Sequence, residues 1–135
     1  MSRIKLAGAL ALAVLFAGPA SAQSGGSGGG VAPGASSKWG SIYYSQSTRA
    51  YGYSFQHGGQ AAAEAAAYKN CSGRAADCKK AVSFENGCGA LAVSPKGGWG
   101  SGHGPTRERA EYYAMGVCQK NSSSQCSVIR WQCSQ

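Results

Sequence analysis

Apolar and polar residues alternate in several short stretches of the chain and follow a helical period in two longer ones. Tyr51, Tyr53 and Phe55 are two residues apart, so residues 50–55 are predicted to form a strand with one apolar face. Residues 60–70 are rich in alanine, which has the highest helix propensity, and are predicted to form a helix. A second helix is predicted after the capping residue Thr106, because the apolar residues that follow lie on one helix face. These residues are Ala110, Tyr113, Ala114, Val117 and Cys118.

The remaining stretches predict further short strands, and the order of elements recurs. Residues 41–45, 78–85, 89–94 and 127–132 are predicted strands, and a short one begins at Trp99. The order strand, strand, helix, strand therefore appears twice, over residues 39–87 and 88–133. A repeat of roughly fifty residues indicates one supersecondary unit used twice, with a core shared between the copies. The aligned positions are Trp39–Ser45 with Cys88–Ser94, Glu64 with Glu111, Cys71 with Cys118, and Phe84 with Trp131.

Short turns join most of the predicted strands, which favours antiparallel pairing. Asn86-Gly87 is a tight-turn signal that leads directly into the strand 89–94. Val82 and Phe84 are predicted to share one face of their strand, and Ile129 and Trp131 one face of theirs. The predicted class is α+β, with one or two small, mainly antiparallel sheets and two helices on one side.

The N-terminal residues have the pattern of an export signal. A basic start is followed by an apolar run over residues 6–18 and by the small residues Ala20-Ser21-Ala22, which predicts a signal peptide over residues 1–22. The apolar run is too short to span a membrane, and no other segment predicts a transmembrane helix. Residues 23–38 are rich in Gly and Ser and predict a flexible linker before a domain at 39–135. We therefore expect a protein of the periplasm or the extracellular space.

All six cysteines lie in the predicted exported part, where disulfides are the expected state. Six cysteines allow many pairings, but the repeat makes Cys71–Cys78 and Cys118–Cys126 equivalent short loops. Cys88–Cys133 then remains, and it would join the C-terminus to the seam between the copies. It closes the longest loop, so the chain-entropy argument predicts that it stabilises the fold the most, by about 4 kcal/mol.

The chain is basic, with 13 Lys and Arg against five Asp and Glu and a net charge of +8. The predicted signal peptide contains two of these bases, so the mature charge is +6. Together with several tyrosines, this charge favours binding of a protein or an anionic envelope partner. The alternative is simple solubility, with the aromatic residues in the core. Lys79-Lys80 is the single adjacent basic pair, which argues against a specific nucleic-acid reader.

Several motifs together resemble a known family. They are W-G-x-I-x-x-S from Trp39, an Ala-rich helix that ends in Cys71, F-x-N-x-C-G-A-L-A-V from Phe84, and Gly97-Gly98-Trp99-Gly100. Over residues 39–133 the chain resembles the bacterial secreted domain of unknown function DUF4189. The resemblance implies export, disulfides and a duplicated unit, and it supplies no catalytic residues. His103 stands where such sequences often have an aromatic or small residue.

Residues 98–104 form a Gly-rich run before the second helix, which could bind an anion. The run lacks the spacing of a dinucleotide-binding loop and the lysine of a P-loop, so a close-packed loop is the preferred interpretation. No cofactor is expected. No metal site is expected either, because the sequence has no Cys-x-x-Cys and no histidine pair at helical spacing.

Two arrangements of residues are candidates for catalysis. His57 and His103 lie in Gly-rich loops, and either could act with a glutamate as a general acid or base. Glu64 and Glu111 occupy matched positions and could form a carboxylate pair like that of a glycosidase. The preferred interpretation is that the histidines are exposed and that the glutamates are solvated or paired, beside Lys69 and Arg107. The glutamates considered for the histidines are Glu64, Glu85 and Glu108.

The leading hypothesis is an exported, monomeric, non-enzymatic binding module, with a protein or envelope partner that it inhibits or neutralises. One alternative is a small cell-wall hydrolase built on His103 and a glutamate. Another is a structural envelope or stress protein. The predicted binding surface consists of Tyr43, Tyr53, Trp99, His103 and Arg107.

Overall fold

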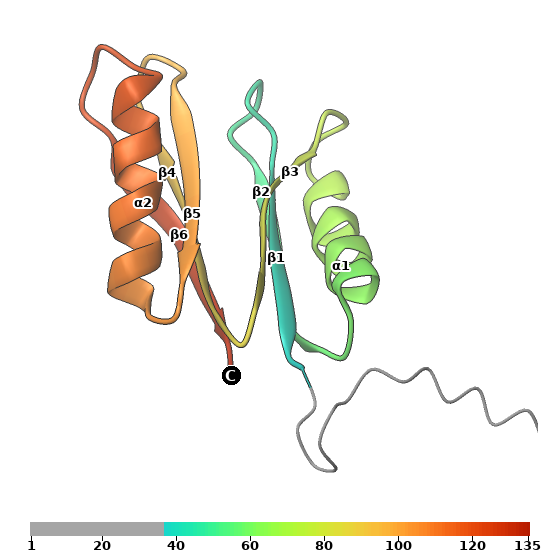
Figure 1. The fold of residues 1–135 in the computed structure, drawn as a ribbon. Helices are drawn as coiled ribbons and strands as arrows, with labels where there is room; N and C mark the ends of the chain where they lie inside the picture. Colours follow the sequence, from blue (N-terminus) through green and yellow to red (C-terminus); the bar gives the residue numbers. More distant parts are fainter. Residues whose placement is uncertain (1–36) are drawn as a thin grey trace, which may run out of the picture. The chain divides into compact units, whose positions relative to one another are not determined.

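The computed structural model describes residues 37–135, so the predicted signal peptide and most of the predicted linker lie outside the described residues. Two copies of one unit follow each other, each with the order strand, strand, helix, strand (Figure 1). The duplicated order predicted from the sequence is therefore confirmed. The first copy comprises β1 (Trp39–Tyr44), β2 (Tyr51–His57), α1 (Gln60–Ser72) and β3 (Lys79–Glu85). The second comprises β4 (Gly87–Val93), β5 (Trp99–Gly104), α2 (Arg107–Lys120) and β6 (Ser127–Ser134).

Each copy forms its own antiparallel sheet of three strands. The strand orders are β2-β1-β3 and β5-β4-β6, so the first strand of each copy lies in the middle of its sheet. Strand β4 is buried along its whole length because both of its faces are covered. Leu91 and Val93 face the other sheet, whereas Cys88, Ala90 and Ala92 face α2. The predicted α+β class with antiparallel strands is confirmed.

The helices lie on separate sheets, which corrects the prediction that both cover one side. Helix α1 packs on β1 and β2, helix α2 packs on β5 and β4, and the inner faces of the two sheets meet. The reason is the turn at Asn86. This residue has a φ of 47° and joins β3 of one sheet to β4 of the other, so it is a corner between sheets and not a hairpin. Asn86 is fixed by hydrogen bonds in both directions with the backbone of Lys38, at 2.8 and 2.9 Å.

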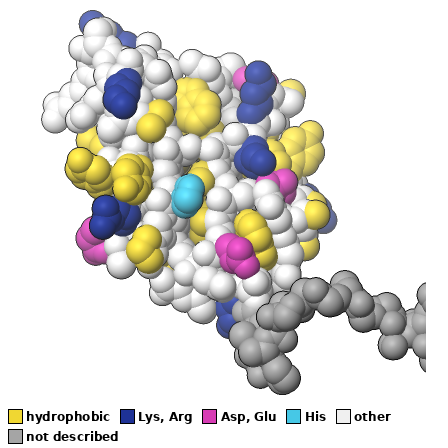
Figure 2. All heavy atoms as spheres, in the orientation of Figure 1, with side chains coloured by type: hydrophobic (Ala, Val, Ile, Leu, Met, Phe, Trp, Pro, Cys, Tyr) yellow, Lys and Arg dark blue, Asp and Glu magenta, His cyan; other side chains and the backbone are white. Residues whose placement is uncertain are grey.

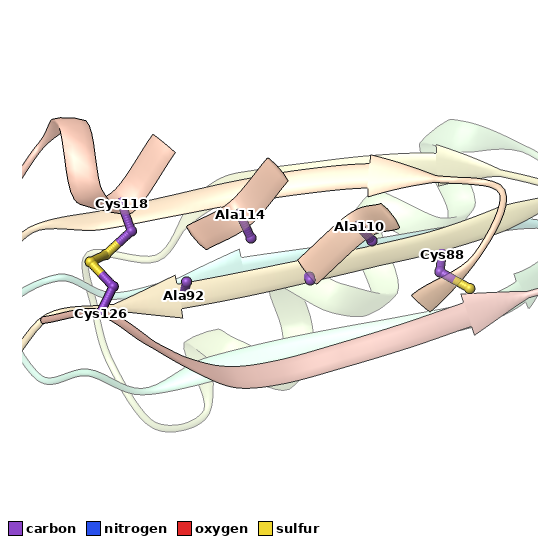
Figure 3. Close-up of a cluster of buried hydrophobic side chains, with 7 residues drawn as sticks. Cys88, Ala92, Ala110, Ala114, Cys118 and Cys126 are labelled. Atoms are coloured by element: carbon purple, nitrogen blue, oxygen red, sulfur yellow. A yellow bond between two sulfur atoms is a disulfide. The ribbon is translucent and has the colours of Figure 1, made fainter. Parts of the chain in front are cut away.

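Small residues allow each helix to approach its sheet closely. The buried residues of α1 are Ala63, Ala67 and Cys71, and those of α2 are Ala110, Ala114 and Cys118 (Figure 3). A Cβ added at Gly52 or Gly100 would overlap the helix backbone. The apolar face predicted for the second helix was too wide, because Tyr113 and Val117 are 46% and 41% exposed. A helix this close to a sheet buries one row of small side chains and leaves the flanking positions in solvent.

The layer between the sheets is built from larger side chains. Ile42 and Leu91, from the two central strands, are fully buried and pack with Val82, Phe84 and Val93. The ring of Phe84 lies over Gly40 and Gly89, where a Cβ would overlap it. This shared apolar layer is the core that the repeat predicts.

The predicted alignment of Phe84 with Trp131 is wrong by one residue. The pairing of each closing strand with its central strand has an irregularity at the equivalent place. Beside it, Ser83 pairs with Ser41 in the first copy, and Trp131 pairs with Ala90 in the second. Trp131 is therefore the counterpart of Ser83 and lies on the helix side, 39% exposed, whereas Phe84 is 3% exposed between the sheets. The prediction that Ile129 and Trp131 share a face is also wrong, because the irregularity leaves Ile129 unpaired and turns it into the inner layer. A shift of one residue moves a side chain to the other face of a strand.

Three disulfides link the described chain, and they are the pairs that the repeat predicts. Cys71–Cys78 and Cys118–Cys126 each tie the end of a helix to the segment before the next strand. Cys88–Cys133 joins opposite positions of β4 and β6. No helix within residues 37–135 is both long enough and apolar enough to cross a membrane.

Candidate functional site

The five residues predicted to form a binding surface do not lie together. Tyr43 is under α1, with its ring edge-on to Tyr68 at 5.7 Å. Burial, and to a lesser degree the Glu64 carboxylate, raise the pKa of Tyr43, so its hydroxyl stays neutral. Arg107 lies on the outer face of the other sheet, where its guanidinium covers the ring of Trp131 at 4.1 Å.

Tyr53, Trp99 and His103 are at the edges of the sandwich. Tyr53 is on β2, which faces β6, and the Arg130 guanidinium covers its ring at 3.5 Å. Trp99 and His103 are on β5, which faces β3 at the opposite edge. Trp99 packs against Tyr44 at 5.6 Å between ring centroids. The predicted set is therefore divided among at least three surfaces.

Within the described residues, no hydrogen bond or ion pair joins the histidine candidates to the glutamate candidates. His103 is exposed on β5. Glu64 accepts hydrogen bonds from Gln60, Ser83 and Lys80 at 2.8, 2.8 and 3.2 Å. These bonds, that from Gln60 first, hold the pKa of Glu64 below its usual value. A carboxylate of this kind is ionised at neutral pH and is poorly suited to act as a general acid.

Glu64 and Glu111 occupy matched positions on separate helices that cover different sheets. Glu64 is paired with Lys80 at 3.2 Å, and Glu111 with Arg107 at 2.8 Å. The predicted neighbour Arg107 is therefore correct, whereas Lys69 is replaced by Lys80. The pair does not face a common cleft, so the glycosidase-like arrangement is absent from the described residues. The same part of the chain contains no group of three or more His, Cys, Asp or Glu placed to hold a metal ion.

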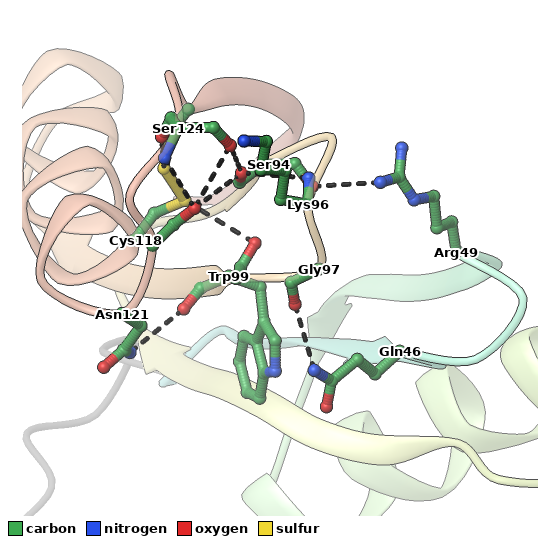
Figure 4. Close-up of a disulfide and its surroundings, with 12 residues drawn as sticks. Gln46, Arg49, Ser94, Lys96, Gly97, Trp99, Cys118, Asn121 and Ser124 are labelled. Carbon is green, nitrogen blue, oxygen red and sulfur yellow. Dashed lines mark hydrogen bonds between the residues drawn. A yellow bond between two sulfur atoms is a disulfide. The ribbon is translucent and has the colours of Figure 1, made fainter.

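The turns and disulfide loops of both copies gather at one end of the molecule, at the top of Figure 1. We call residues 45–50, 73–78, 94–98 and 121–126 the loop end. Hydrogen bonds join the two copies there (Figure 4). Gln46 Nε2 donates to the Gly97 carbonyl at 2.9 Å, and Arg49 Nη2 donates to the carbonyls of Ser94 and Pro95 at 3.0 and 2.6 Å. The loop end is thus one connected surface.

A buried serine anchors the disulfide loop of each copy. Ser45 directly follows β1 and donates a hydrogen bond to the Asp77 carboxylate, while its counterpart Ser94 bonds Ser122 at 2.6 Å and also contacts Ser124. The hydrogen bonds from Ser45 and then Ser47 lower the pKa of Asp77 below its usual value. The one acidic residue of the loop end is therefore engaged by hydroxyl groups.

Positive charge is concentrated at the loop end and on the ends of α1, α2 and β3 beside it. Six of the 13 Lys and Arg residues are exposed there, against one of the five acids, Asp77. Two shallow depressions lie among them, of about 450 Å³ beside Lys96 and Trp99 and about 490 Å³ between Lys69 and Arg74. In the face shown in Figure 2, the basic side chains are separate from one another. The six basic residues are Arg49, Lys69, Arg74, Lys79, Lys96 and Lys120.

Sequence reasoning missed a second surface, on α2. Four of the six exposed large hydrophobic residues lie on α2 or β6, and hydrophobic side chains gather over α2 at the left of Figure 2. A groove of about 880 Å³ runs along the helix beside Val128. The excess of large apolar residues on this helix over the alanine-rich first one was the available signal. The four residues are Tyr112, Tyr113, Val117 and Trp131.

The fold and surfaces together define a class: a small, duplicated, disulfide-linked α+β module with a basic end. The three disulfides are compatible with an exported protein. The chain belongs to the family described as Domain of unknown function (DUF4189), whose sequence profile matches residues 39–133. Neither the curated proteins nor the solved structures contain a significant match.

Proposed function

We propose that this protein is an exported, non-enzymatic binding module whose loop end binds an anionic partner of the cell envelope. The observation that carries the proposal is the segregation of charge, with six exposed bases and a single engaged acid at one end. Concentrated charge of one sign raises the local concentration of oppositely charged ligands and the rate of their association.

The rigidity of the loop end supports the same function. Two disulfides close its helix-to-strand loops, and Gln46 and Arg49 join the turns of the two copies. Surfaces that are ordered before binding avoid the entropy cost of fixing loops and side chains. The bases are long side chains on a fixed frame, which suits a charged polymer or lipid surface more than one small ligand.

The test compares two double variants with the same change in net charge. Lys69→Gln with Lys96→Gln removes two charges from the loop end and the helix turn beside it, and Lys38→Gln with Arg109→Gln removes two from elsewhere. Each base near an anionic lipid surface contributes about 1 kcal/mol, so the first pair is expected to weaken binding to phosphatidylglycerol vesicles roughly thirtyfold. The second pair is expected to change it far less. Vesicle co-sedimentation at low salt and at about 0.15 M salt measures both.

Equal losses in the two double variants would contradict the proposed surface, and so would absence of binding by the wild type at low salt. A pull-down from an envelope extract extends the test to acidic proteins that the module would inhibit or neutralise. The enzymatic alternative makes a different prediction. Peptidoglycan clearing that disappears in His103→Ala would replace a binding function with hydrolysis.

A further inference from the structure

The solvent side of α2 carries a row of four residues at intervals of four. Glu108, Tyr112, Gly116 and Lys120 follow one another along the face opposite the buried Ala110, Ala114 and Cys118. Tyr112 is 73% exposed, the largest exposure among the large hydrophobic residues described. A Cβ added at Gly116 would contact nothing within 4 Å, so the helix has an open depression one turn beyond the tyrosine.

The first copy serves as an internal comparison. Helix α1 also buries a row of three residues and packs on its own sheet in the same way as α2. The residues of α1 and its C-terminal end that match the row are Ala61, Ala65, Lys69 and Gly73, at the constant offset that relates Cys71 to Cys118. None of them is large and apolar. The unit therefore folds without this row, and the protruding tyrosine of α2 needs an explanation outside the fold.

The charges at the two ends of the row are complementary. Glu108 begins it and Lys120 ends it, and within residues 37–135 neither forms an ion pair. They are twelve positions apart in the sequence, which corresponds to about 18 Å along the axis. A helix of the same sequence in the opposite direction would place a lysine at the glutamate and a glutamate at the lysine.

We propose that two copies of this chain dimerise through the solvent side of α2, antiparallel and about a two-fold axis that crosses the helix at the level of Ala114. A two-fold axis pairs Glu108 of each copy with Lys120 of the other and sets Tyr112 of each copy over Gly116 of the other. Each Tyr112 ring fills the depression at Gly116 of the other copy, and a Glu108–Lys120 ion pair forms at each end of the interface. Shape and charge complementarity therefore favour the same register. Met115 and Val128 line the groove beside this row. Contacts from one helix per copy give a small interface, so the dissociation constant is expected in the micromolar range.

Sedimentation equilibrium of the full mature chain tests the charge pairing. Glu108→Lys and Lys120→Glu, each alone, place like charges opposite each other twice and are expected to weaken the dimer at least tenfold. Mixing the two variants restores both pairs in a heterodimer, which is expected to form at concentrations where each variant alone is monomeric. In a parallel dimer the wild type would already place like charges opposite each other at both ends, so neither single substitution would weaken it. Glu85→Lys, an equal charge change away from α2, is the control and is expected to leave the dimer unchanged.

Gly116→Leu tests the shape. Leucine fills the depression and also favours the helix, so the variant is expected to remain folded, with unchanged circular dichroism, and to be monomeric. The matched control on the first copy is Lys69→Leu, which is expected to dimerise like the wild type. A wild type that stays monomeric up to about 1 mM overturns the proposal, as does a mixture without rescue or a dimer unaffected by Gly116→Leu. Lys69→Gln with Lys96→Gln is expected to keep the dimer, so failure of the binding proposal and failure of this one are distinguishable.

Discussion

Ser45 and Ser94 occupy the same position in the two copies but anchor different partners. Ser45 bonds a carboxylate, Asp77, whereas Ser94 bonds the hydroxyl groups of Ser122 and Ser124. Both serines are buried at the end of a central strand and hold a disulfide loop. Only the first anchor includes an ionisable group, so the stability of the two loops should differ in its response to pH.

Asp77→Asn tests this difference. Hydrogen bonds from Ser45 and Ser47 lower the pKa of Asp77 in the folded state, so its carboxylate stabilises the fold above its unfolded pKa, near 4. This contribution is lost as pH falls through the lower, folded pKa. We expect Asp77→Asn to reduce the free energy of unfolding at pH 7 and to converge with the wild type in acid. Urea unfolding as a function of pH measures the difference.

Ser94→Ala is the matched control, because it removes the uncharged anchor of the second copy. Its loss of stability is expected to stay nearly constant over the same pH range. A pH-independent effect of Asp77→Asn would show that the carboxylate contributes only as a hydrogen-bond acceptor.

At the scale of the elements, glycine determines how closely each helix packs on its sheet. Gly100 lies directly beneath the backbone of α2 at Cys118, and its counterpart Gly52 lies beneath α1 at Cys71. The two contacts are equivalent in the repeat. A methyl group at either place forces the helix outward and opens its row of buried alanines.

Gly100→Ala is therefore expected to destabilise the protein by about 1–3 kcal/mol, the usual cost of overpacking. Gly58→Ala is the control, because an added Cβ there meets no atom within 4 Å and Gly58 is not among the glycines with positive φ. Its effect is expected within about 0.5 kcal/mol. Chemical denaturation compares the two, and equal effects would mean that helix and sheet separate without cost.

The elements themselves could be predicted from the sequence, because alternation, alanine content and turn residues are local signals. Which face of each strand and helix is buried could be predicted only in part. The loop before β6 is one residue longer than its counterpart, and that residue moves Trp131 to the side of α2. The Asn86-Gly87 signal gives a turn but does not say whether the next strand joins the same sheet. The helices consequently lie on opposite outer faces.

The candidate site was harder to predict than the fold for the same reason. Tyr43, Trp99 and Arg107 are all aromatic or basic, yet the sequence contains no local signal for which surface each one occupies. The loop end unites turns that are about fifty residues apart, and its hydrogen bonds between Arg49 and Pro95 depend on the packing of whole sheets. By contrast, the two short disulfides follow from the repeat, because their cysteines occupy equivalent places, and Cys88–Cys133 follows as the remaining pair.

For the whole molecule, the three disulfides should differ in their contribution to stability. Cys88–Cys133 has a sequence separation of 45, against 7 and 8 for the other two. The chain-entropy relation gives about 4 kcal/mol for the long loop and about 2.5 kcal/mol for each short one. Replacing Cys88 and Cys133 by alanine is therefore expected to cost more than replacing Cys71 and Cys78. Denaturant unfolding measures both, and an equal or smaller loss for the long loop would contradict the expectation.

The bond between Cys88 and Cys133 also determines which part of the protein extends under a pulling force. A force applied between Lys38 and Gln135 passes from Cys133 to Cys88 through the disulfide. It therefore bypasses α2 and the strands around it. Only the first copy stretches. The segment closed by the bridge has a sequence separation of 45, roughly 150 Å of extended chain, and it cannot extend until a reductant breaks the disulfide. One copy therefore extends under load, while the other keeps its shape.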